Sequence, residues 1–120
     1  MALAMGLPAY AQKDPLDEGG GRGRLKLTAA QRQQIKEIRQ RYRQSRQPIH
    51  TRVKALRLEL LELLAQEQPD KGQVNAKVRE IMDVQMQLQQ SIVDELFEIR
   101  GVLTPEQWKA LRSRLLDEML

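Results

Sequence analysis

The sequence contains no cysteine and only four aromatic side chains among its 120 residues. The absence of cysteine excludes disulfides, zinc fingers and thiol catalysis. The scarcity of aromatic residues argues against a thick globular core, so Leu, Ile, Val and Met must supply the packing. There is a single histidine, His50, and no apolar run in the sequence is long enough to span a bilayer.

Apolar residues recur at helical spacing, and no segment alternates as a strand would. The pattern predicts an all-α fold with four helices, at residues 28–47, 49–66, 71–100 and 105–118. Pro48 separates the first two helices, as either a kink or a short turn. The turn at Pro69 and Asp70 joins the second helix to the third, which predicts a long antiparallel helical hairpin.

Two predicted helices begin with the motif Leu-Thr-x-x-Gln. Its copies consist of Leu27, Thr28 and Gln31, and of Leu103, Thr104 and Gln107. A threonine at the N-cap accepts a hydrogen bond from an unpaired backbone N–H. A glutamine three residues later reaches back to the N-cap amide and completes a capping box. The motifs therefore predict helix starts and no chemistry of their own.

Charge is distributed unevenly along the chain. Residues 22–57 carry twelve Lys and Arg against one acid, Glu37, whereas residues 58–120 carry twelve acids against seven bases. The basic stretch has three interpretations: a solvated face paired with acids of a neighbouring helix, a nucleic-acid site, or a surface that attracts acidic or partly unfolded chains. No DNA-binding motif occurs, and the one Tyr of the basic stretch, Tyr42, is too few for base stacking, so no nucleic-acid partner is predicted.

The N-terminal residues 1–11 are small and apolar, and Ala-Tyr-Ala at 9–11 has the spacing of a signal-peptidase site. We interpret 1–11 as the remnant of a secretion signal, cleaved before Gln12; the alternative is a disordered apolar tail. Residues 12–26 contain Pro15 and a glycine-rich run, which predicts a flexible arm. The helical domain then covers residues 27–118.

No catalytic set can be built around the one histidine, so the chain is not predicted to be an enzyme and no cofactor is required. A metal site is the open question. His50 combined with Met82, Met86 or a glutamate of another helix would suit zinc, nickel or copper. In the opposing interpretation, His50 is a surface or capping residue and the methionines fill the core.

The two motifs, the helical hairpin and the secretion remnant together resemble the LTxxQ group of bacterial periplasmic proteins. This group includes the Spy and CpxP stress proteins, the zinc-resistance-associated protein and heavy-metal-resistance sensors of the CnrX type. The resemblance covers residues 25–116. It is closest over 69–111, which look like the metal-resistance branch.

The resemblance implies an intertwined, cradle-shaped homodimer whose concave face is basic, with apolar patches, and holds unfolded clients without ATP. The basic residues that fit this face are Arg32, Lys36, Arg39, Arg43, Arg46 and Arg57. Metal-sensing members use several His with Glu and Met on facing helices. This chain has only His50 and lacks the His-rich termini of zinc-binding members, so the sensing chemistry does not carry over as a whole.

We therefore expect a periplasmic chaperone or adaptor of the stress response that binds partly unfolded envelope proteins. The alternative is a periplasmic heavy-metal sensor or regulator for zinc, nickel or copper that pairs with a membrane sensor protein. A dimeric helical scaffold without a ligand of its own is the third hypothesis.

Overall fold

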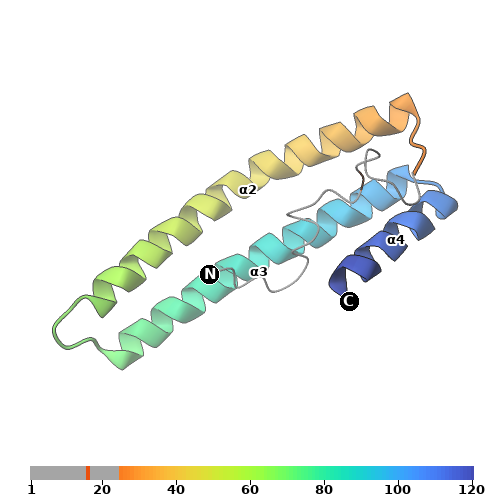
Figure 1. The fold of residues 1–120 in the computed structure, drawn as a ribbon. Helices are drawn as coiled ribbons and strands as arrows, with labels where there is room; N and C mark the ends of the chain where they lie inside the picture. The colour runs from red at the N-terminus through yellow and green to blue at the C-terminus, as the bar shows by residue number, and fades with distance from the viewer. Residues whose placement is uncertain (1–15, 17–24) are drawn as a thin grey trace. The chain divides into compact units, whose positions relative to one another are not determined.

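A computed structural model describes residue 16 and residues 25–120. These residues are all-helical and contain no strand; their helices are α2 (Ala29–Leu64), α3 (Lys71–Val102) and α4 (Pro105–Met119) (Figure 1). The predicted all-α fold class is thus confirmed. The secretion remnant at 1–11 and most of the arm at 12–26 lie outside the described residues. Within the described part, no helix has the length and apolar character that crossing a membrane requires.

The count of four helices is wrong for the described residues, because α2 runs through Pro48 without a break. Residues 28–47 and 49–66, predicted as two helices, belong to this one element. A helical proline leaves the carbonyl four residues earlier, here that of Gln44, without its amide donor. Gln44 and Pro48 are both exposed, so water can satisfy that carbonyl. On the other face, Ile49 packs against the core and keeps the helix in place beyond the proline.

The chain forms two compact units. The hairpin unit, Arg41–Ser91, contains the last two thirds of α2 and the first two thirds of α3, which run antiparallel. Asp70 ends the connecting turn and caps α3, since its Oδ1 accepts a hydrogen bond of 2.8 Å from the Gly72 N–H. The seam of the hairpin is a small aliphatic cluster of Val53, Leu56, Ile81 and Val84, with Ile49, Leu60 and Leu88 packed against it.

The terminal unit comprises, among the described residues, the start of α2 up to Gln40 and everything from Ile92 onward. Its buried apolar residues are Leu16, Leu25, Leu27, Ile35, Ile38, Leu96, Ile99, Leu111 and Leu115. Ile99 and Leu111 are the most completely buried of these. One acid, Glu95, is buried as well.

The apolar stripe of α3 is wider than the surface that covers it. The sequence places Met82, Met86, Val93 and Phe97 beside the main stripe, and all four are exposed, by 38% to 58%. A helix buries the ridge that faces its neighbour, so residues on the flank of that ridge stay in water when no further element covers them. The folded chain therefore presents large apolar side chains at its surface.

Leu56 and Leu58 are a matched pair for testing the hairpin seam. Leu56 is 3% exposed and Leu58 is 61% exposed. Leu56→Ala should lower the free energy of unfolding by about 2–5 kcal/mol, because it removes buried methyl groups and leaves a cavity. Leu58→Ala should change it by less than about 0.5 kcal/mol. Urea denaturation followed by circular dichroism measures both; equal losses would contradict this account of the seam.

Candidate functional site

Both Leu-Thr-x-x-Gln motifs form the reciprocal hydrogen bonds of a capping box. At the start of α4, Thr104 Oγ1 accepts from the Gln107 N–H at 3.2 Å, and the Thr104 N–H donates to Gln107 Oε1 at 2.9 Å. At the start of α2, the corresponding distances between Thr28 and Gln31 are 3.0 and 2.9 Å. Each motif therefore satisfies two backbone donors that a helix start leaves unpaired.

The two glutamine side chains also bind each other, a contact that the sequence did not predict. Gln31 Nε2 donates to Gln107 Oε1 at 2.7 Å, and Gln107 Nε2 donates to Gln31 Oε1 at 3.1 Å. Gln31 Nε2 further donates to the carbonyl of Val102, and Gln107 Nε2 to those of Leu25 and Lys26. The amide pair thus joins the starts of α2 and α4 to the end of α3 within the terminal unit.

The amide pair also holds a strained backbone position. Lys26 has a φ of 53°, in the left-handed region that non-glycine residues adopt at a cost of about 1–3 kcal/mol. Its neighbours Leu25 and Leu27 are 2% and 6% exposed. Burial of both leucines and the hydrogen bonds from Gln107 stabilise this conformation against the strain.

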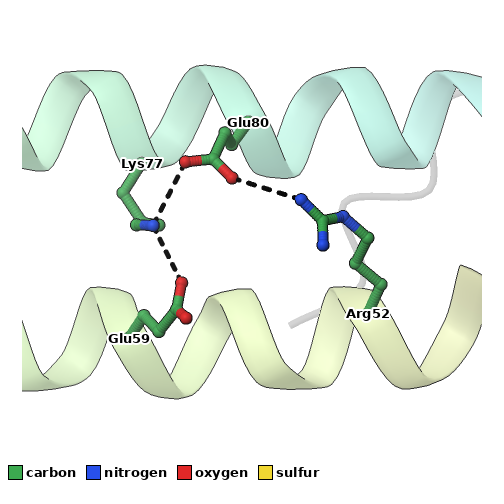
Figure 2. Close-up of polar contacts among 4 residues, drawn as sticks. All are labelled: Arg52, Glu59, Lys77 and Glu80. Atoms are coloured by element: carbon green, nitrogen blue, oxygen red, sulfur yellow. Dashed lines mark hydrogen bonds and ion pairs between the residues drawn. The ribbon is translucent and has the colours of Figure 1, made fainter.

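On the hairpin unit, four charged side chains connect α2 to α3 (Figure 2). Lys77 Nζ donates to Glu59 Oε2 at 2.8 Å and to Glu80 Oε1 at 3.1 Å, and Arg52 Nη2 lies 3.6 Å from Glu80 Oε2. The hydrogen bond to Glu59, followed by that to Glu80, raises the pKa of Lys77 above its usual 10.5. Partly exposed ion pairs add little stability, so their main effect is to favour one register of the hairpin.

The predicted basic residues are placed in two different ways. Arg32 Nη2 donates to the Leu27 carbonyl at 2.7 Å. Arg46 is half-buried in the hairpin unit, where its Nε donates to Ser91 Oγ at 2.9 Å and its guanidinium lies 5.5 Å from the centre of the Tyr42 ring. These two arginines therefore have structural contacts. Of the others, Arg39 is half-buried and the exposed ones are Lys36, Arg43 and Arg57.

Two cations that the sequence did not single out lie at the surface. Lys54 is exposed and stands three residues before Arg57, so helical spacing alone could have identified it. Arg100 lies over two rings of the terminal unit, 5.2 Å from the centre of Trp108 and 5.9 Å from that of Phe97. The spacing of Phe97 and Arg100 was visible in the sequence, whereas the approach of Trp108 depends on the tertiary fold.

The candidate metal ligand His50 is exposed on α2. Among the residues that the structure describes, no three His, Cys, Asp or Glu side chains come together closely enough to hold an ion. Met82 and Met86 offer exposed thioethers on α3. A thioether does not replace the further imidazole or carboxylate ligands that a zinc or nickel site would need. The described donors of a single chain therefore do not fit a resident centre for zinc or nickel.

A double-mutant cycle on Gln31 and Gln107 tests whether the two motifs act as one structural unit. Each single change to Ala should lower the free energy of unfolding by about 1–3 kcal/mol, because several part-buried hydrogen bonds are lost. The double variant should lose less than the sum, since both single changes break the same amide pair. Gln34→Ala, an exposed site on α2, is the control, and urea denaturation is the measurement. Strictly additive losses would show that the motifs cap their helices independently.

Comparison with known proteins identifies the family. No curated protein and no solved structure matches the chain. The sequence model of a family described as heavy-metal resistance matches residues 1–110. This match agrees with the resemblance to the LTxxQ group and its metal-resistance branch, and it covers most of the sequence. The chain belongs to the heavy-metal resistance family.

Proposed function

We propose that the chain acts in heavy-metal resistance as a periplasmic regulator that works through a membrane-bound partner. The family match over residues 1–110 is the observation that carries this proposal. The signal-peptidase pattern at 9–11 supports a location outside the cytoplasm. Metal challenge is the condition under which the protein is needed.

The regulator acts by protein contact, because the described donors of one chain do not fit a resident metal centre. Its folded surface favours such contacts. Leu58, Leu61 and Phe97 are each more than half exposed, and large apolar side chains left in water indicate surfaces that associate. A homodimer that covers some of these side chains is included in the proposal.

Growth under metal challenge tests the function, and calorimetry tests the mechanism. Loss of the protein should lower the concentration of zinc, nickel or copper that the host tolerates. His50→Ala should restore tolerance as well as the unchanged chain does, and titration of the pure protein should show metal binding weaker than micromolar. Unchanged tolerance in cells that lack the protein would refute the function. Micromolar binding that His50→Ala abolishes would refute action by protein contact and establish direct sensing.

An ATP-independent chaperone is the second candidate, because exposed cations and exposed leucines lie close together in the last part of α2. Lys54 and Arg57 are followed there by Leu58 and Leu61, a combination that attracts acidic, partly unfolded chains. An equimolar amount of the dimer should suppress light scattering by a reduced, unfolding client, and Leu61→Ser should weaken the effect. No suppression at equimolar dimer would exclude this role.

A further inference from the structure

Six exposed side chains of α2 form one line along the hairpin unit. They follow each other at intervals of seven, four, three, four and three residues, which keeps them on one side of a helix. These residues are Arg43, His50, Lys54, Arg57, Leu61 and Leu64. At 1.5 Å per residue the line is about 30 Å long. We call it the basic edge.

The acids of α2 in the hairpin unit lie away from the basic edge. Glu59 is on the opposite flank of α2, where it joins Lys77 (Figure 2). Glu62 comes three residues after Glu59 and also falls outside the line. The ion-paired flank and the basic edge are therefore the two sides of the seam that buries Leu56. No acidic residue of α2 interrupts the row of positive charge.

The cations of the basic edge have no charged partner among the described residues. Arg43, Lys54 and Arg57 are exposed and enter none of the ion pairs that these residues form. The row ends in Leu61 and Leu64, which are 61% and 50% exposed. An edge of this kind is complementary to an extended negative surface that has apolar material next to its charge.

We propose that the basic edge binds the surface of an anionic lipid bilayer. Headgroup phosphates match the cations between 43 and 57, and the acyl boundary just below them accepts Leu61 and Leu64. A bilayer is flat and offers both phosphates and an apolar layer along the whole line of about 30 Å. The basic edge therefore needs no shaped pocket in its partner. An acidic protein would have to place a negative group opposite each cation of the basic edge. This is the alternative partner that the experiment below tests.

This inference rests on the proposed envelope location but not on the proposed role in metal resistance. It places the regulator at the membrane, where its partner is found. Cation pairing with lipid phosphate and leucine insertion each supply a modest part of the binding. Because both contributions come from the same edge of α2, they add when that edge lies along a bilayer surface.

Vesicle co-sedimentation of the full chain tests the proposal. The chain should pellet with vesicles that contain equal parts of phosphatidylglycerol and phosphatidylcholine, and not with phosphatidylcholine alone. Binding should decrease at high salt, which screens the phosphate contacts. Each cation contributes about fivefold in partitioning. Arg43→Glu combined with Lys54→Glu and Arg57→Glu should therefore reduce binding by on the order of a hundredfold or more.

A matched triple variant tells whether vesicle binding depends on the basic edge or only on the net charge of the protein. Arg79→Glu, Lys109→Glu and Arg112→Glu change the net charge equally, at exposed sites outside the basic edge, and should retain most of the binding. Leu61→Ser with Leu64→Ser should weaken it at unchanged charge, with circular dichroism confirming that all variants fold. Equal losses in the two triple variants would overturn the proposal. So would binding to an acidic unfolded protein without binding to the anionic vesicles. Either result leaves the growth test under metal challenge unaffected.

Discussion

The hairpin unit depends on a single narrow seam between two helices. A pair of helices has only one contact line, and here aliphatic residues such as Val53, Leu56 and Ile81 fill it. With so few aromatic side chains in the sequence, the buried cluster of the seam consists of aliphatic residues alone. Both flanks of the seam are consequently surface. One flank is neutralised by the ion pairs around Lys77, and the other keeps its positive charge.

The terminal unit is held together by side-chain hydrogen bonds as well as by apolar packing. Three helix ends meet there, and each would leave backbone groups without partners. The side chains of Gln31 and Gln107 satisfy several of these groups at once, because each amide donates and accepts simultaneously. A pair of glutamines can do this only when both motifs are present, which gives a physical reason for the repetition of the motif in one chain.

The sequence predicted where the helices begin better than it predicted which of their residues are buried or in contact. Caps at Thr28, Asp70 and Thr104 are local signals, so the helix starts could be read directly. Pro48 led to a wrong prediction of two separate helices, because the effect of a proline on a helix depends on exposure and packing. Local sequence does not contain that information. Likewise the width of the apolar stripe on α3 did not reveal how much of it a neighbour covers, and Met86 lies in water. The glutamine pair joins residues far apart in sequence, and no local rule could find it.

The basic residues show the same difference between what local sequence reveals and what depends on the tertiary fold. Composition alone identified a basic first third of the chain, but it could not separate Arg46, which is bonded within the fold, from Arg43 and Arg57, which are exposed. That separation changes the chemistry available to the surface. Cations held by internal partners stabilise the fold, whereas exposed cations next to exposed leucines are available for contacts with other molecules. In a family named for metal resistance, the described part of this chain offers one exposed imidazole, His50, beside a row of exposed cations, so any contact that the row makes would be with an extended negative surface and not with a coordinated ion.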